Sequence, residues 1–427
     1  MEGPMSEFDV IVVGGGIAGL VAAAFASRNG SRVVLLEASA TFGGRARTRI
    51  VSGYHFNQGA HALYRDGLLD EILQDLGIAA AGGVPPLVAG FFVAGDTLHA
   101  APFSASGLAS TSLLTDTEKS EMGKLLRGLL DGSIETPPGG SLRDALAALS
   151  PSPRVRSTLA AMVRLTSIVH APDLADASAL LGQLAGGLAR NARYVDGGWE
   201  TIVDGLRSAC VEFGASLRSG CPVASIDRGA SWRATLRDGS SLTARAVILA
   251  VNPAQAMALS PRIEGLEEAT NVVPAKVACL DIGLAHLPRP DILFALDIDR
   301  PLYFSVHSAA ARLAPQGAAL LHAMRYIEPD EKPSRGQLIA ELEGFIDLTQ
   351  PGWREQERAR QFLGAMPVNS SIPLAARRGL HGRPGVAVPN GEGLFIAGDW
   401  VGPVGMLADA ASASGRSAGE AAAAFAR

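Results

Sequence analysis

Three glycines near the N-terminus have the spacing of a phosphate-binding turn. Gly14, Gly16 and Gly19 form a G-x-G-x-x-G pattern between a β-branched apolar run at residues 10–13 and a helix-forming run at residues 20–26. In such a turn the first glycine permits a tight bend, the second lets the backbone approach a pyrophosphate, and the third lets helix and strand pack closely. The free N–H groups at the start of the helix, at the positive end of its dipole, form an anion site. The stretch therefore predicts a dinucleotide-binding site.

An acidic and a basic residue follow where the rest of a dinucleotide would need them. Residues 32–36 are expected to form a second strand, and Glu37 stands at its C-terminal end. Its distance from the glycines suits a carboxylate that accepts hydrogen bonds from ribose hydroxyls. Gly43, Gly44 and Arg45 come next, where a backbone without side chains and a guanidinium can both approach phosphate oxygens.

Taken together, this strand, glycine turn, helix, acidic residue and Gly-Gly-Arg resemble the N-terminal signature of the two-dinucleotide-binding-domain flavoproteins, which include amine oxidases and phytoene desaturases. The resemblance implies FAD rather than NAD as the cofactor. It extends over essentially the whole chain, and Gly-Gly-Trp at residues 197–199 is similar to the phytoene dehydrogenase-like branch. Because only one dinucleotide fingerprint is present, we expect oxygen, a quinone or another carrier as the electron acceptor.

A second stretch, residues 394–415, resembles the C-terminal flavin motif of the same family. The resemblance implies that Asp399 bonds the ribityl chain, and that Gly405, Met406 and Leu407 begin a helix whose N-terminus points at the pyrimidine edge of the flavin. Backbone donors at the positive end of a helix dipole would stabilise the negative charge of the reduced ring. It further implies that backbone groups at Val223 hold the adenine edge. Since no cysteine lies near this motif, we expect the FAD to be non-covalent.

Two residues are candidates for catalysis. His61 lies in a glycine-containing segment that, by the resemblance, passes beside the flavin ring; the alternative is a histidine hydrogen-bonded within a loop. Lys276 shares one face of an expected strand with apolar residues at alternate positions. In amine oxidases the lysine of this stretch reaches the flavin through a water, whereas the alternative is a lysine at a solvated rim.

The same alternation groups further polar residues on the expected strands. His322, Met324 and Tyr326 share one face, as do Tyr303, Ser305 and His307. One of these two sets is expected to line the substrate pocket, and the sequence does not distinguish them.

The middle of the chain must supply the elements that cover the cofactor. Residues 115–190 carry apolar residues at helical spacing, with Ser141 as the expected N-cap of a helix at residues 142–149. A strand pair is expected at residues 88–99, strands at 275–283, 292–298, 302–307 and 318–327, and a helix at 335–348. The predicted fold class is α/β: a discontinuous Rossmann-like FAD-binding domain (residues 1–78, 195–260 and 385–427), an inserted helical cap (79–194) and a mixed-sheet α+β substrate domain (261–384).

Composition excludes several classes of function. The chain has 427 residues, of which 48% are hydrophobic and 19% charged, as in a folded globular protein. The net charge is −5 and no stretch is dense in Lys or Arg, which argues against binding to nucleic acid. The three cysteines and eight histidines lack metal-ligand spacing, so we expect no metal, no disulfide and a cytoplasmic location. No apolar run reaches the length of a transmembrane helix; a peripheral membrane contact stays open.

The expected function is removal of hydride from a small organic substrate by an FAD-dependent oxidoreductase. Aromatic residues make up only 5% of the chain, and amine oxidases of the family hold the amine between two aromatic rings. This favours dehydrogenation or desaturation of an apolar, isoprenoid-like molecule. The alternatives are an amine or amino-acid oxidase that produces hydrogen peroxide, and a non-redox FAD-dependent isomerase.

Overall fold

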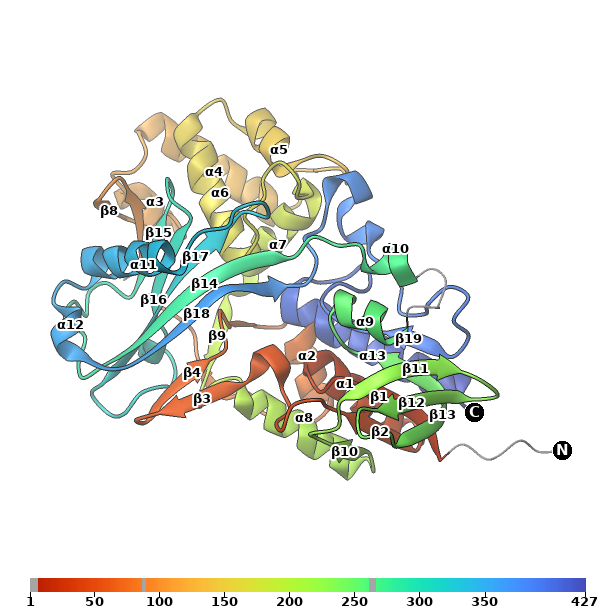
Figure 1. The fold of residues 1–427 in the computed structure, drawn as a ribbon. Coiled ribbons are helices and arrows are strands. Elements are labelled where there is room, and N and C mark those ends of the chain that lie inside the picture. Colours follow the sequence, from red (N-terminus) through yellow and green to blue (C-terminus); the bar gives the residue numbers. More distant parts are fainter. Residues whose placement is uncertain (1–6, 87–89, 261–265) are drawn as a thin grey trace.

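Two seven-stranded sheets organise the protein (Figure 1). The computed structural model describes residues 7–86, 90–260 and 266–427. In the first sheet, β10, β2, β1, β13 and β19 are parallel neighbours, and β12 and β11 continue the sheet with antiparallel pairing. The bounds of these strands are β1 Phe8–Val13, β2 Val33–Leu36, β10 Ser216–Arg218, β11 Val223–Arg228, β12 Trp232–Leu236, β13 Ser241–Leu249 and β19 Leu394–Ile396.

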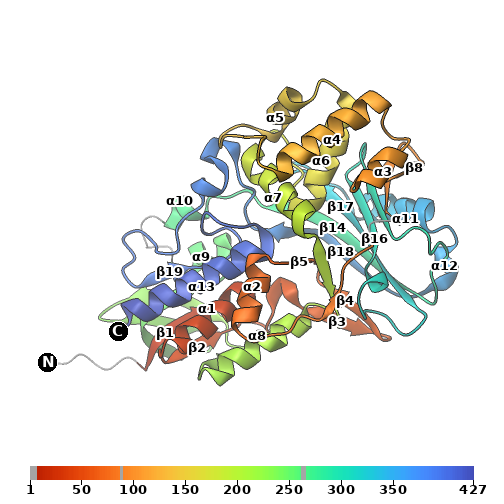
Figure 2. The same cartoon turned by 180° about the vertical axis from the view of Figure 1, so that it is seen from behind.

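Helices from both ends and from the middle of the chain cover one face of this sheet (Figure 2). They are α1 (Ile17–Arg28), α2 (Leu68–Asp75), α8 (Glu200–Glu212) and α13 (Leu407–Phe425). Helices α1 and α13 approach backbone to backbone, since a Cβ added at Gly415 or Gly419 would lie 2.5 or 2.4 Å from a carbonyl oxygen of α1. Residues more than 390 positions apart are thereby held together. The sheet is also buried on its other face, where Val34, Leu36 and Trp232 form a second core with α9 (Pro253–Leu259).

The second sheet is largely antiparallel and separates two cores. Its strand order is β18, β14, β17, β16, β15, β7 and β8, with parallel pairing only between β15 and β7. One face is covered by α11 (Arg335–Thr349), and the other face looks toward the helical cap. The strand bounds are β7 Gly90–Ala94, β8 Thr97–Ala100, β14 Ala275–Leu284, β15 Phe294–Asp297, β16 Leu302–Val306, β17 Ala319–Ile327 and β18 Glu357–Asn369.

Two features of this sheet differ from the sequence prediction. Residues 90–100, expected within the cap, supply β7 and β8 to the sheet; residues 88 and 89 of the expected pair lie outside the described residues. Strand β18 is not among the elements expected from the sequence, and it contains Gly364 and Pro367, which are unusual in a strand interior. The structure accommodates both because β18 is an edge strand with irregular register against β14. Figure 1 shows β14 and β18 running together from this sheet toward the first.

The helical cap has capped N-termini that its sequence specifies. The Ser141 side chain accepts a hydrogen bond from Asp144 N at the start of α5, as predicted, and Thr115 forms a capping box with Glu118 at the start of α4. The cap helices are α3 Ala105–Ser110, α4 Asp116–Leu130, α5 Leu142–Leu149, α6 Pro153–Ser167 and α7 Ala177–Arg190. With the two sheets, these helices confirm the predicted α/β fold class.

Short elements link the larger parts. The small strands are β3 Thr48–Val51, β4 Tyr54–Asn57, β5 Leu63–Tyr64, β6 Gly82–Gly83 and β9 Ala192–Val195, and the short helices are α10 Leu266–Thr270 and α12 Trp353–Gln356. None of the helices in the described ranges has the length and hydropathy to cross a lipid bilayer.

Candidate functional site

The glycine turn between β1 and α1 leaves room where a pyrophosphate would lie. Gly14 has φ +105°, and a Cβ added there would lie 2.4 Å from Ala250 O. At Gly19 an added Cβ would lie 1.9 Å from Gly14 O, whereas at Gly16 it would meet nothing within 4 Å. Gly16 is the N-cap of α1 and no side chain caps this helix. The first N–H groups of α1 therefore face the open space in front of Gly16.

Glu37 is held at the mouth of this turn. Its Oε2 accepts a hydrogen bond from Gly15 N, and its Oε1 accepts one from Ser39 N, both at 2.7 Å. Each carboxylate oxygen keeps a second lone pair with which to accept a hydroxyl. The segment before Val223, the first residue of β11, lies alongside, since Cys221 N donates to Glu37 O at 2.9 Å. The structure thus brings Glu37 and the Val223 segment to the same end of the sheet.

Arg45 joins the N-terminal and C-terminal motifs. Gly43 N donates to Gly15 O at 2.7 Å, which places the Gly-Gly-Arg segment beside the glycine turn, and Gly44 follows with φ +55°. The Arg45 Nη2 lies 2.9 Å from Asp399 Oδ2, and its Nη1 donates to Val368 O at 2.9 Å. Two motifs separated by about 350 residues in the sequence therefore meet through one ion pair.

The C-terminal motif contains polar atoms that are buried and have no partner in the described structure. Asp399 Oδ2 accepts from Ser370 N at 3.0 Å, but its Oδ1 is unpaired, as is the neighbouring Asn369 Nδ2. Arg383 donates to Gly405 O at 2.9 Å and leaves its Nε and Nη2 unpaired. Burial lowers the pKa of Arg383 to about 10, although Asp399 opposes the shift. Such orphaned groups are costly without a partner, so they fit a polar ligand such as FAD.

The start of α13 offers backbone donors next to these groups. Gly405 has φ +72° and Leu407 has φ +55°, so the chain turns sharply into the helix. Met406 is the N-cap, and no side chain caps the helix. As at α1, the first N–H groups are left for a ligand at the positive end of the helix dipole.

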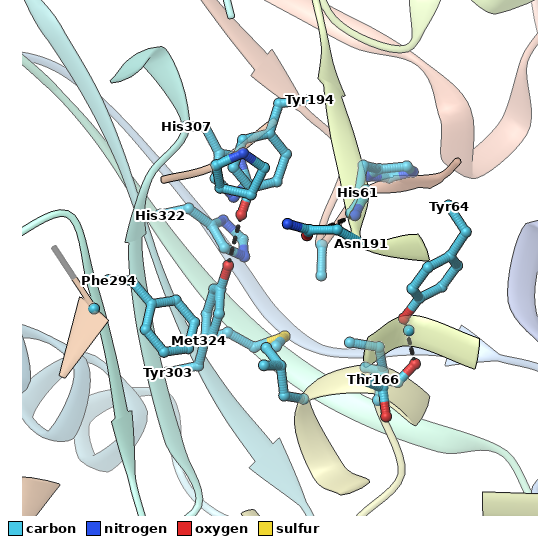
Figure 3. A pocket seen from close by; sticks show the side chains of 18 of the residues that line it. His61, Tyr64, Thr166, Asn191, Tyr194, Phe294, Tyr303, His307, His322 and Met324 are labelled. Atoms are coloured by element: carbon cyan, nitrogen blue, oxygen red, sulfur yellow. Dashed lines mark hydrogen bonds between the residues drawn. The ribbon is translucent and has the colours of Figure 1, made fainter. Parts of the chain in front are cut away.

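A cavity of about 200 Å³ extends from Leu407 to the second sheet. Figure 3 shows His61 and Asn191 on one side of it, and Tyr303, His307, His322 and Met324 on the other. Apolar residues of the cap, among them Leu165, Ile168, Leu184 and Leu188 of α6 and α7 and their connection, complete the wall. Aromatic residues are thus gathered here although they are scarce in the sequence.

His61 lines this cavity and is also hydrogen-bonded within its loop. Its Nδ1 lies 2.9 Å from Gly59 O, and its ring centroid lies 4.7 Å from that of Trp199. Burial lowers the pKa of His61 to about 4, and the positive charge of Arg45 acts in the same direction. His61 is therefore neutral at physiological pH. His61 thus lines the cavity, as expected of a residue near the flavin, and is hydrogen-bonded within its loop, as in the alternative interpretation.

The catalytic role considered for Lys276 is not supported by its position. On β14, Ala278, Leu280 and Ile282 share its face and pack in the core covered by α11. Val277 and Cys279 face the opposite way, in the core that contains Met324 and Tyr326. Alternation along the strand thus directs Lys276 away from the cavity. The alternation correctly grouped Lys276 with Ala278, Leu280 and Ile282, but it could not say whether this face of the strand lies toward the cavity or toward α11.

Both polar sets that the sequence left open lie on the cavity side of the sheet. In the antiparallel register Tyr303 stands opposite Met324, and Ser305 opposite His322. Their side chains therefore project to the same face. Tyr303 Oη donates to Ser305 Oγ at 2.8 Å and lies 3.1 Å from Tyr194 Oη. The alternatives were not exclusive.

Sequence reasoning missed Asp281. It stands opposite His322 in the register of β14 and β17, and its Oδ1 is hydrogen-bonded to His322 Nδ1. Its Oδ2 accepts from Gln361 Nε2 of β18 at 3.0 Å. The available signal was a lone acidic residue within the apolar strand AKVACLDIGL, since a buried carboxylate requires partners and is common at functional sites.

Solved structures with low sequence identity share this fold. An oxidoreductase from Methanosarcina mazei has a TM-score of 0.77 and 17% identity, covering 96% of this chain and 99% of that chain. Wild-type putrescine oxidase bound to putrescine has a TM-score of 0.72 and 16% identity, covering 98% of each chain. Reduced UDP-galactopyranose mutase has a TM-score of 0.68 and 14% identity, covering 97% and 95%.

Comparison of the sequence with protein families identifies the family of this chain, whereas the solved structures show only its fold. No curated protein matches this chain. The sequence model described as flavin containing amine oxidoreductase matches residues 17–277, which is more than half of the chain. The protein therefore belongs to the flavin containing amine oxidoreductase family and is an FAD-dependent oxidoreductase.

Proposed function

We propose that this enzyme dehydrogenates a neutral, largely apolar molecule, such as one end of an isoprenoid-like chain. The observation that carries the proposal is the charge of the cavity: in the described part of the chain no Asp, Glu, Lys or Arg lines it. An ammonium or carboxylate buried there would lack an ionic partner, which is costly. The apolar cap residues instead favour a hydrocarbon body, and the imidazole and phenol groups favour one uncharged polar group.

The proposed cofactor site uses both ends of the chain. Gly14, Gly16 and Gly19 would leave space for the pyrophosphate, with Glu37 toward the ribose and Arg45 with Gly44 toward the phosphates. Asp399 would meet the ribityl chain, the backbone at Val223 the adenine, and the residues 405–407 the pyrimidine edge. The unpaired polar atoms of Asp399, Asn369 and Arg383 support this arrangement. Arg45→Ala and Glu37→Ala should each weaken FAD retention.

When bound, FAD supplies a hydride acceptor, with oxygen, a quinone or another carrier reoxidising it. The protein contributes positioning and exclusion of water, which account for much of the catalysis in such reactions. A non-covalent cofactor is supported by the positions of the cysteines: Cys210 packs against α1 and Cys279 lies on β14, both buried. Three free cysteines also support a reducing, cytoplasmic location, with peripheral membrane contact left open.

A second candidate is oxidation of an amine that enters the cavity uncharged. Tyr194 and Tyr303 with His307 give the cavity an aromatic wall, and the Tyr194 and His307 ring centroids are 4.1 Å apart. The fold is shared with putrescine oxidase. Against this, none of the described residues that line the cavity carries a carboxylate to attract a cationic amine.

Anaerobic bleaching of the flavin distinguishes these candidates. The purified, FAD-loaded protein would be mixed with polyenes, apolar alcohols and amines, and the loss of the oxidised flavin spectrum recorded. Bleaching by neutral apolar molecules supports the proposal. Bleaching by amines, with release of ammonia and of peroxide in air, supports the second candidate. Failure of every substrate to bleach the flavin would instead favour a non-redox isomerase, the class suggested by the mutase that shares the fold.

A further inference from the structure

A buried imidazole in the cavity wall has one ring nitrogen engaged and one free. His322 is 3% exposed and its Nδ1 is hydrogen-bonded to Asp281, which is 4% exposed. Its Nε2 is buried and has no partner in the described structure. In a neutral imidazole, the Nδ1 that faces the carboxylate carries the proton and the Nε2 offers a lone pair. His322 lines the cavity, so a buried hydrogen-bond acceptor without a partner in the described structure lies in the cavity wall.

Asp281 is fixed by elements on either side of it. Gln361 Nε2 donates to Asp281 Oδ2 at 3.0 Å and to Asn57 O at 2.7 Å, and Gln58 Nε2 donates to Gln361 Oε1 at 3.2 Å. The chain of hydrogen bonds runs from β4 through β18 and β14 to β17. Such a network locks the imidazole orientation and its tautomer.

Among the described residues near His322, neither of the other imidazole rings, His61 and His307, is hydrogen-bonded to a carboxylate. The ring of His307 stacks on that of His322 with centroids 5.0 Å apart, and the ring of Tyr303 lies 5.9 Å away. Burial lowers the pKa of both His61 and His307, so neither carries charge at neutral pH. Among the described residues, the titratable and charged groups near this cluster are Asp281 and Cys279 of β14, Tyr303 of β16, Tyr194 of β9, His307 of the 3-10 turn His307–Ala309, His61 and Arg45.

We propose that His322 is the proton acceptor of the enzyme, that Asp281 is its positioning residue, and that the substrate is an apolar alcohol whose hydroxyl donates to His322 Nε2. The inference rests on the proposed function, because it refines the neutral, apolar substrate class. Oxidation of a carbinol breaks one C–H and one O–H bond and forms a C=O bond. Bound FAD would supply the acceptor for the hydride and its electron pair, and the proton would pass to His322 Nε2 and then to solvent. The Asp281 carboxylate compensates the charge that the imidazole acquires.

A chromogenic phenol tests proton acceptance without turnover. The FAD-loaded protein would be titrated with 4-nitrophenol at a pH where the free phenol is protonated, and the difference spectrum followed for the phenolate band. Wild-type protein should bind it saturably and display that band. In His322→Gln the band should be lost and affinity should fall about tenfold or more. Asp281→Asn keeps the imidazole but allows the other tautomer, so the band should also be lost.

Controls separate this result from misfolding and from the proposed function. His381→Gln, at an exposed position, should behave as wild type, and the flavin content and visible spectrum of each variant report folding. Absence of phenol binding by wild-type protein, or an unchanged phenolate band in His322→Gln, would overturn the inference. Because the phenol assay needs no oxidation, a negative result there does not change what the flavin-bleaching screen says about the substrate class. A negative bleaching screen likewise does not change what phenol binding says about His322.

Discussion

Backbone groups form most of the cofactor region, whereas side chains form the wall of the substrate cavity. The cofactor region presents mainly backbone: glycines that leave space and two uncapped helix starts, at α1 and α13. The cavity presents side chains contributed by the second sheet, the cap and the loop around His61. In a site formed by backbone, an added side chain fills the space that the ligand needs or collides with a neighbouring backbone atom. In a site formed by side chains, a residue can be replaced while the strand that carries it keeps its fold. The cofactor region should therefore be much more sensitive to substitution than the cavity wall.

The largest effect is expected for Gly19→Ala. The added Cβ would lie 1.9 Å from Gly14 O, and a backbone atom cannot move aside cheaply. We expect loss of FAD binding and a free energy of unfolding lowered by several kcal/mol, measured by flavin absorbance and chemical denaturation. Gly182→Ala is the matched control, because a Cβ there meets nothing and α7 should gain about 0.5–1 kcal/mol. Full cofactor content in Gly19→Ala would contradict the proposed role of the turn.

A smaller effect is expected for Asp399→Ala. This carboxylate is 3% exposed, holds Ser370 N and Arg45, and keeps one unpaired oxygen. Removing it should raise the Kd for FAD about ten- to hundredfold, because a buried charge-assisted bond is lost. Arg45→Ala should weaken binding less, since its side chain is 43% exposed. Titration of the apoprotein by flavin fluorescence measures both; the reverse order would break the assignment.

On the cavity side, His61 gives a pH-dependent effect. The pKa is lowered from 6.5 to about 4 in the folded protein, so between these values the unfolded chain binds a proton that the folded chain rejects. The free energy of unfolding therefore falls as the pH falls through this window, by about 2 kcal/mol from pH 7 to pH 5 for this group. Denaturation of His61→Gln should lack this portion of the decline, whereas His381→Gln should retain it. Identical pH dependence in wild type and His61→Gln would refute the prediction.

The smallest effect is expected for Lys276→Met. Its strand face packs toward α11 rather than toward the cavity. Activity with any substrate found by the bleaching screen should change by less than about twofold, as for a substitution outside the site. The rate of flavin reduction is the measurement. A large loss, with unchanged FAD content, would restore the catalytic role that the resemblance suggested.

The two regions also differ in how far sequence could predict them. The glycine turn, Glu37, Arg45 and the Asp399 motif are contiguous patterns, and the structure brings them together at one site. The residues that line the cavity are those on the face of the second sheet that meets the cap. The alternation of residues along β14 separates its two faces, but it does not say which of them faces the cap. Asp281 and Gln361 are brought together only by the pairing of β14 with β18. The sequence of β18 is not typical of a strand, because it contains Gly364 and Pro367. Contacts fixed by tertiary pairing are not encoded locally.

The paired strands β14 and β18 have one further consequence. At one end Asn369 adjoins Asp399, and farther along the same strands Asp281 and Gln361 support the cavity wall. In the proposed arrangement, the same pair of strands would therefore support both the FAD site and the substrate cavity. Mutant libraries restricted to the inward-facing positions of β16 and β17 other than His322 would leave β14 and β18 unchanged, and offer a route to new substrate specificities.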